Sequence, residues 1–288
     1  MTNFLNHYTI DQNRPLDPTT RNVLSIVNRV AIELDCPYIL VGATARDLLL
    51  FHVFGIPVTR ATLDIDFALA VDSWERFQQL RDGLLATGSF EEGTVLHRIF
   101  LKAPNVLDRI PIDLIPFGAI AEADMISWPP EQDTMMTVAG FEDVLAAAVT
   151  VQVDPELTVP VASLAGIAVL KLFACHERPN SDKDPVDLYR IISTYADAGN
   201  MDRLYEDEID LLEEVGHDLE LAGAALLGLD ARRLCSPATA VKLRELFVET
   251  DFAEKIAERI RVSRFPLDPE RLGRVYQQMS RFTEQLIQ

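Results

Sequence analysis

The segment LDIDFALAV (residues 63–71) carries two aspartates, Asp64 and Asp66, among apolar residues. In an extended strand, residues two apart project from the same face, so both carboxylates should point the same way. Two such charges repel each other unless a cation lies between them, and charge is costly inside an apolar strand. A hard divalent cation with oxygen ligands would resolve both problems. The alternative is a pair of solvent-facing acids on an edge strand.

A third aspartate occurs in a similar setting. Asp113 lies in the apolar segment IPIDLIPFG (residues 110–118), which we expect to form a strand next to the first. Three carboxylates on one sheet surface are suited to two Mg²⁺ ions about 3.5 to 4 Å apart, the arrangement used for in-line nucleotidyl or phosphoryl transfer. Taken alone, Asp113 would be read as an ordinary acid in a hairpin.

The segment VGATARDLLL (residues 41–50) predicts a phosphate-binding turn. An apolar strand ends at Gly42 and a helix follows, so the backbone can approach a ligand closely and aim free N–H groups at an anion. We expect Gly42, Ala43 and Thr44 to contact a nucleotide. The glycine turn is weak evidence alone, and its combination with the paired and the single aspartate is more specific.

The elements that position these residues follow from hydrophobic periodicity. Mixed strands and helices over the first half, then an almost wholly helical pattern from Ser163, predict an α+β protein. We expect a small mixed β-sheet flanked by helices in residues 1–155 and a helical domain in residues 156–288. In the first half the expected helices are 18–36, 44–55 and 72–88, and the expected strands are 37–43, 62–71, 97–103 and 109–118, the last two forming a hairpin.

Composition excludes several classes of function. The chain has 288 residues, with 26 basic against 45 acidic residues and a net charge of -19. Extended DNA or RNA binding is therefore disfavoured, because it needs a basic face. Three scattered cysteines do not suggest a disulfide framework or a zinc cluster. The N-terminus lacks a signal-peptide pattern and no apolar run is long enough to span a membrane, so we expect a cytoplasmic protein without membrane association.

Together, Gly42, the Asp64–Asp66 pair and Asp113 resemble the motifs of the DNA polymerase β-type nucleotidyltransferase superfamily. The opening, with Arg46 and Asp47 after the glycine, is similar to that of tRNA CCA-adding enzymes and poly(A) polymerases. That resemblance implies that Arg46 and Asp47 form an internal ion pair. Ala43 stands where the superfamily has glycine or serine, a change that removes a hydroxyl and leaves the backbone amide.

Beyond the first half, the chain resembles the AbiEii-like nucleotidyltransferases of type IV toxin-antitoxin and abortive-infection systems. The resemblance rests on the segment VASLAGIAVLKLFACHERPNSDKDPVDLYRI (residues 161–191). It implies that Lys171 contacts a triphosphate, that Lys183 adds positive charge there, and that Asp184 or Asp187 completes the active site. Asp184 before Pro185 also fits a helix N-cap, with Asp187 placed favourably for the helix dipole.

The leading interpretation is a Mg²⁺-dependent nucleotidyltransferase that transfers NMP from an NTP to an acceptor hydroxyl. The resemblance implies a toxin-type enzyme acting on tRNA, with a possible antitoxin partner. A small-molecule acceptor stays open, and so does a non-catalytic protein that binds nucleotide or a partner. A true CCA-adding or poly(A) enzyme would need nucleotide-selecting side chains and a basic tail, neither of which is visible in the sequence.

Overall fold

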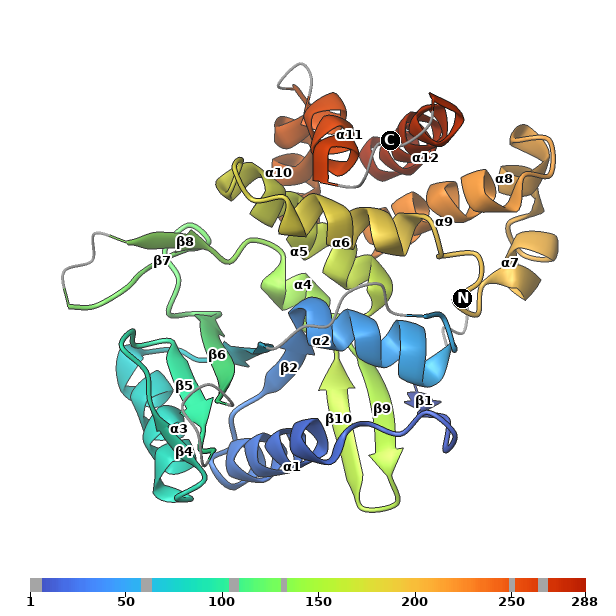
Figure 1. Cartoon of the computed structure of the whole chain (residues 1–288). Helices are drawn as coiled ribbons and strands as arrows, with labels where there is room; N and C mark the ends of the chain where they lie inside the picture. Colours follow the sequence, from blue (N-terminus) through green and yellow to red (C-terminus); the bar gives the residue numbers. More distant parts are fainter. Residues whose placement is uncertain (1–6, 58–63, 104–108, 131–133, 249–251, 264–268) are drawn as a thin grey trace. The chain divides into compact units, whose positions relative to one another are not determined.

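The computed structural model describes residues 7–57, 64–103, 109–130, 134–248, 252–263 and 269–288. The chain forms two compact units, Met1–Ser163 and Leu164–Gln288. Strands occur in the first unit, and the described residues of the second are helices and their connections (Figure 1). The expected α+β class with a helical C-terminal region is confirmed. The beginning of the expected strand 62–71 and most of the turn of the expected hairpin lie outside the described residues.

Eight strands of the first unit form one mixed sheet in the order β1-β9-β10-β2-β3-β6-β5-β4, and β7 and β8 form a separate pair. The sheet is larger than the small sheet expected from the sequence. The elements of this unit are β1 (His7–Thr9), α1 (Pro18–Glu33), β2 (Tyr38–Val41), α2 (Gly42–Asp47), a π-helix (Leu48–Val53), β3 (Ile65–Ala70), α3 (Trp74–Ala86), β4 (Phe90–Glu92), β5 (Arg98–Leu101), β6 (Ile110–Phe117), β7 (Met125–Ser127), β8 (Met135–Thr137), α4 (Phe141–Ala146), β9 (Val149–Asp154) and β10 (Leu157–Val161).

The centre of this sheet separates an apolar face from a polar one. Phe67 and Leu114 are completely buried on β3 and β6, whereas Asp66 and Asp113, one position earlier on the same strands, are half-buried. Because neighbouring residues of a strand face opposite ways, the apolar side chains enter the core and the carboxylates stay on the other face. The alternation seen in the sequence therefore determines which face carries the acids.

The first unit extends past residue 155, where the sequence suggested a boundary. β10 pairs antiparallel with β9 and parallel with β2, so residues up to Val161 belong to the sheet. The segment VTVQVDPELTVPV (residues 149–161) shows the alternation of a hairpin around a short Pro-Glu turn. That alternation predicts a hairpin, which extends the sheet to Val161. The division between the two units then falls after Ser163.

The second unit is a bundle in which α9 (Leu219–Leu234) packs along α12 (Pro269–Ile287). A Cβ added at Gly228 on α9 would come within 2.1 Å of the Phe282 carbonyl oxygen, so glycine permits the two helices to lie this close. The other helices are α5 (Leu164–Glu177), α6 (Lys183–Ile192), α7 (Met201–Tyr205), α8 (Ile209–Glu214), α10 (Pro237–Val248) and α11 (Phe252–Ser263). Among the described helices, none has the length and apolar character needed to cross a membrane.

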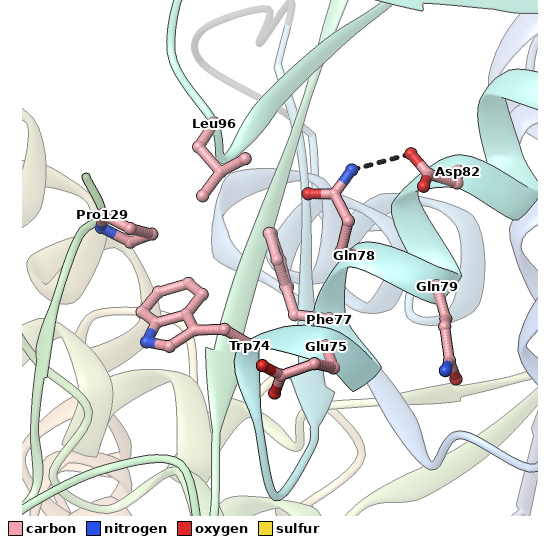
Figure 2. Close-up of a pocket in the computed structure, with 8 residues that line it drawn as sticks. All are labelled: Trp74, Glu75, Phe77, Gln78, Gln79, Asp82, Leu96 and Pro129. Carbon is pink, nitrogen blue, oxygen red and sulfur yellow. Dashed lines mark hydrogen bonds between the residues drawn. The ribbon is translucent and has the colours of Figure 1, made fainter.

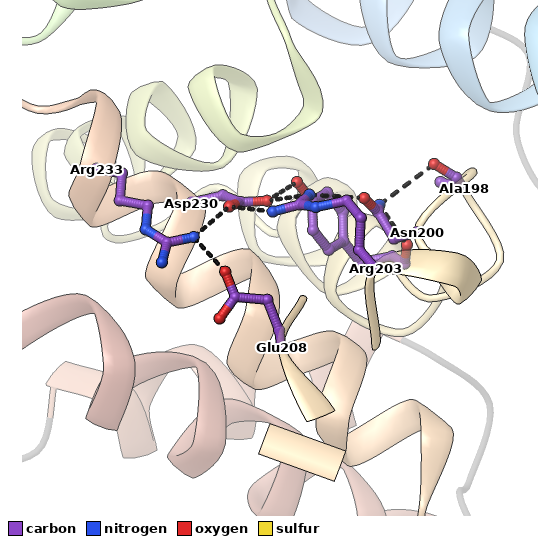
Figure 3. A network of polar contacts seen from close by, with 7 residues as sticks. Ala198, Asn200, Arg203, Glu208, Asp230 and Arg233 are labelled. Carbon is purple, nitrogen blue, oxygen red and sulfur yellow. Dashed lines mark hydrogen bonds and ion pairs between the residues drawn. The ribbon is translucent and has the colours of Figure 1, made fainter. Parts of the chain in front are cut away.

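A buried polar network ties α9 to the segment before it (Figure 3). Asp230 accepts hydrogen bonds from the Tyr195 hydroxyl at 2.7 Å and from two nitrogens of Arg203 at 2.8 Å each. Arg233 lies 3.8 Å from Asp230 and forms an ion pair with Glu208 at 2.5 Å. Burial, followed by the nearby charge of Asp230, raises the pKa of Tyr195 far above its usual range. The phenol therefore stays protonated and donates to the carboxylate.

Candidate functional site

Strand pairing brings two of the predicted site carboxylates side by side. β3 and β6 run parallel, and Asp66 stands directly opposite Asp113 in their register. Residues opposite each other on adjacent strands have Cβ atoms about 5 Å apart, close enough for their side chains to interact. Asp64 directly precedes β3 and is half-buried. The three predicted carboxylates thus come from adjacent strands of the first unit.

Arg98 is a member of this cluster that the sequence did not reveal. It stands opposite Asp113 on β5, the next strand of the sheet. Its Nε and Nη2 each donate to one Asp113 oxygen at 2.6 Å, and the Asp113 side chain is 14% exposed. A bidentate pair of this kind is among the stronger ionic contacts in proteins. The only available signal was the strand segment HRIFLKA (residues 97–103), whose pairing partner is not readable from the sequence.

The glycine turn lies directly against Asp66. Gly42 begins α2 with φ at +71°, and a Cβ placed there would come within 2.0 Å of the Asp66 Oδ2 atom. Any larger residue would have to displace the carboxylate. The first N–H groups of a helix have no carbonyl partner within the helix, so Gly42 and Ala43 offer donors next to the acidic face.

Thr44, Arg46 and Asp47, which follow Gly42 in this turn, make contacts within the protein. The Thr44 hydroxyl donates to the Asp64 carbonyl at 2.9 Å, so in this structure it braces the strand start. Arg46 and Asp47 form the expected internal ion pair at 2.7 Å, and the Arg46 side chain is 5% exposed. The Thr44 contact links the turn that begins at Gly42 to the residue before β3.

Three of the other predicted residues, Lys171, Asp184 and Asp187, form a cluster in the second unit, whereas Lys183 is exposed at the start of α6. Lys171 on α5 donates to Asp184 Oδ1 and to Asp187 Oδ2 on α6, each at 2.9 Å. Arg178 lies 3.1 Å from the second oxygen of Asp184. Burial acts to lower the pKa of Lys171, and the charges of Asp187 and Asp184 outweigh it, so the pKa lies above its usual value. Lys171 is therefore a buried, charged ammonium.

The helix-cap alternative for Asp184 is wrong. α6 begins at Lys183, an exposed residue, and its N-cap position is Asp182, which makes no capping hydrogen bond. The side chain of Asp184 is 3% exposed and is bound to Lys171. Asp187 is buried in the same way, at 8%. Both acids serve the ion cluster between α5 and α6.

The donor set of the sheet cluster suits a hard divalent cation, because all of its donors are carboxylate oxygens. Over the part of the chain that the structure describes, however, no group of three or more His, Cys, Asp or Glu side chains is gathered to hold a metal. Both oxygens of Asp113 face the Arg98 guanidinium. A cation at these residues would therefore compete with Arg98 for the Asp113 oxygens.

An open pocket of about 440 Å³ lies along α3 in the same unit (Figure 2). The Trp74 ring at its wall contacts Trp128, with ring centroids 5.5 Å apart, and Trp128 in turn contacts His97 at 4.9 Å. Among the described residues, the lining contains carboxylates, amides and apolar groups and no basic side chain: Trp74, Glu75, Phe77, Gln78, Gln79, Asp82, Leu96 and Pro129. Such a lining favours a neutral or cationic molecule over a phosphate.

A central sheet with acids on one face and a glycine-led helix against them has the features expected of a polymerase β-type nucleotidyltransferase. The family model described as "Nucleotidyl transferase AbiEii toxin, Type IV TA system" matches residues 25–271. The chain belongs to this AbiEii nucleotidyltransferase family, and the recognition made from the motifs is confirmed.

Solved structures of nucleotidyltransferases are also similar to the chain. The antibiotic-resistance factor ANT(2'')-Ia is 18% identical over 70% of this chain and 99% of its own, with a TM-score of 0.37. An antigenic nucleotidyltransferase-like protein from Paracoccidioides brasiliensis is 19% identical over 69% and 93%, with a TM-score of 0.42. The Thermotoga maritima CCA-adding enzyme, solved with tRNA, is 12% identical over 96% and 83%, with a TM-score of 0.28. A search among curated protein sequences found no match.

Proposed function

We propose that the protein transfers NMP from an NTP to an acceptor hydroxyl, with Mg²⁺ held by Asp64, Asp66 and Asp113. The observation that carries the proposal is the direct register of Asp66 and Asp113 on adjacent parallel strands. Gly42 lies beside them, at a position where a Cβ would collide with Asp66. When bound, Mg²⁺ would stabilise charge on the phosphate oxygens and lower the pKa of the attacking hydroxyl. Two ions are expected for in-line transfer of this kind.

The residues of the chain have separate tasks in this proposal. The backbone amides of Gly42 and Ala43 bind phosphate oxygens, and Thr44 keeps the turn in place through Asp64. Asp113, as third ligand, helps to activate the acceptor hydroxyl. These roles need donors held in position before the substrate arrives, and the sheet and the braced turn provide that.

For the second unit we propose the roles that the family membership suggests. Lys171, with Lys183, binds the triphosphate, and Asp184 or Asp187 completes the active site. The Lys171 ammonium is already paired with both carboxylates, so it would act as part of an ion cluster. A loss of transfer in Lys171→Met together with retained folding would support this role.

The family description names a toxin of a type IV toxin-antitoxin system, which supports a toxin-type enzyme with a protein partner. We propose a cellular RNA, in particular the end of a tRNA, as acceptor and an antitoxin protein as partner. The net charge of -19 limits the contact to a short stretch of RNA. The cytoplasm, where tRNA is present, is the proposed location.

A small-molecule acceptor is the second candidate, and the pocket of Figure 2 favours it. Glu75 and Asp82 at the pocket would attract an amine-bearing compound, and Trp74 offers an aromatic face. The two candidates predict different labelled products, so one assay separates them.

The test is incubation of the purified protein with each α-labelled NTP and Mg²⁺, in the presence of total RNA or of a small-molecule extract. We expect label transfer from one of the nucleotides. The Asp64→Ala/Asp66→Ala variant should lose at least about 10³-fold in rate, because several kcal/mol of charge stabilisation disappear. The matched control is Asp72→Ala, an exposed acid beyond the other end of β3. Absence of transfer to either acceptor pool with all four nucleotides would refute the proposal.

A further inference from the structure

Three charged residues form a row across the centre of the sheet. Asp66 on β3 is opposite Asp113 on β6, and Asp113 is opposite Arg98 on β5. Residues in direct register project from the same side of a sheet. A guanidinium therefore stands at the end of the same row that carries the proposed metal ligands.

The contact between Arg98 and Asp113 uses the whole carboxylate. Both Asp113 oxygens accept from Arg98 at 2.6 Å, and the Asp113 side chain is mostly buried. A carboxylate in this geometry has its charge matched and its two strongest acceptor directions occupied. A metal ion that approaches Asp113 has to compete with this pair.

The influence of Arg98 extends beyond Asp113. The hydrogen bond to Asp113 is the main cause that raises the pKa of Arg98, and the charges of Asp64 and Asp66 add to the effect. Arg98 is thus a positive charge close to all three carboxylates. It reduces the repulsion that would otherwise act among them.

We propose that Arg98 is an internal counter-ion that competes with the divalent cation for Asp113 and thereby couples metal binding to nucleotide binding. This inference rests on the proposed function of the three aspartates as metal ligands. When the cation binds, Arg98 leaves Asp113 and requires another anionic partner. A phosphate group fits the planar fork of a guanidinium in the same bidentate way as a carboxylate. The triphosphate of an NTP supplies that partner, so metal and nucleotide each favour binding of the other.

A purely structural pair between β5 and β6 is the competing explanation. It predicts that loss of Arg98 lowers stability and leaves metal affinity unchanged. The counter-ion role predicts a higher metal affinity when Arg98 is lost, because removal of a competing positive charge strengthens attraction of another cation. Metal affinity without nucleotide therefore separates the two explanations without any measurement of activity.

The experiment measures Mn²⁺ binding by electron paramagnetic resonance for the full chain without nucleotide. Arg98→Gln should bind Mn²⁺ about tenfold tighter than the wild type, since a charge a few ångströms away is removed. Arg21→Gln is the matched control, because Arg21 forms an equally short pair, 2.6 Å, with Asp154 on β9. That variant changes net charge by the same amount and should leave the affinity unchanged.

The coupling is measured by adding an NTP analogue that cannot be hydrolysed. In the wild type it should tighten Mn²⁺ binding, and in Arg98→Gln the additional gain should be smaller. Circular dichroism shows whether the variant is folded. If it is not, Arg98→Met also removes the charge and keeps an apolar stem of similar length, and it should bind Mn²⁺ more tightly than the wild type for the same reason.

The inference is overturned if Arg98→Gln binds Mn²⁺ no tighter than the wild type. Where Arg98→Gln does not fold, the same result for a folded Arg98→Met variant overturns it. Asp66→Asn distinguishes this failure from failure of the proposed function. If Asp66→Asn weakens Mn²⁺ binding while the Arg98 variants match the wild type, the aspartates are metal ligands and Arg98 is structural. If Asp66→Asn has no effect on Mn²⁺ binding, the metal site itself is refuted, and the inference with it.

Discussion

The sheet cluster of the first unit and the Asp230 network of the second both combine aspartates with arginine, and they differ in charge balance. On the sheet, Asp64, Asp66 and Asp113 share Arg98. In the Asp230 network, Arg203 pairs with Asp230 and Arg233 pairs with Glu208. The Tyr195 hydroxyl also donates to Asp230. A matched, buried network has its charges satisfied by the protein itself, whereas carboxylates that serve as metal ligands take a cation from solution.

The Lys171 cluster combines features of both. Its charges are matched, as in the Asp230 network, and its predicted role is in the reaction, as for the sheet cluster. Lys171 and Arg178 match Asp184 and Asp187, as in a structural network. The family resemblance, in contrast, implies contact with a triphosphate. Stability and activity measurements on the same variants show which description applies to each cluster.

The largest expected effect on stability is that of Asp230→Ala. The change leaves Arg203 without its bidentate partner in a site where Asp230 is 3% exposed. Breaking a buried pair in this way costs about 3 to 5 kcal/mol in free energy of unfolding. Urea denaturation measures it, with Asp207→Ala, an exposed acid between α7 and α8, as control. A loss below about 1 kcal/mol would contradict the view that this network is a main support of the second unit.

A somewhat smaller loss, about 3 kcal/mol, is expected for Lys171→Met, since two carboxylates would remain close together in a buried site. Arg178 offsets part of this, because it stays beside Asp184. Urea denaturation is again the measurement, and Lys255→Met is the control, with the same charge change at an exposed residue of α11. An unchanged free energy of unfolding together with lost transfer would show that the cluster serves the reaction and does not support the fold.

Gly42→Ala should have the smallest effect on stability and a selective effect on the sheet cluster. Its φ of +71° costs an alanine about 1 to 2 kcal/mol, and the new Cβ would displace the Asp66 carboxylate. Gly88→Ala is the matched control, because Gly88 has φ at +76° and open space around it. Both variants should lose stability in urea through the strained φ, and Gly42→Ala should lose somewhat more because the carboxylate has to move. Weaker Mn²⁺ binding in Gly42→Ala alone would confirm the contact with Asp66, and equal binding in both would contradict it.

Local patterns predicted much of this fold because they report local physics. The alternation around Asp66 and Asp113 correctly indicated which side chains enter the core, and the glycine turn led into a helix as expected. The hairpin of β9 and β10 shows the same alternation, and its omission moved the expected boundary to residue 155. The roles of the individual site residues stay predictions until the variants are measured.

The sequence alone was sufficient to infer the kinds of donor present, the face of each strand that carries them, the helical character of the second half and the family. The three-dimensional structure was needed to establish that Asp113 lies opposite Asp66 and that Arg98 binds the Asp113 carboxylate. It was also needed to show that Lys171 binds both Asp184 and Asp187. The physical reason is that the order and register of strands, and the packing of one helix on another, depend on contacts between segments distant in the chain. A side chain's own segment specifies its direction, and the neighbouring segment specifies its partner.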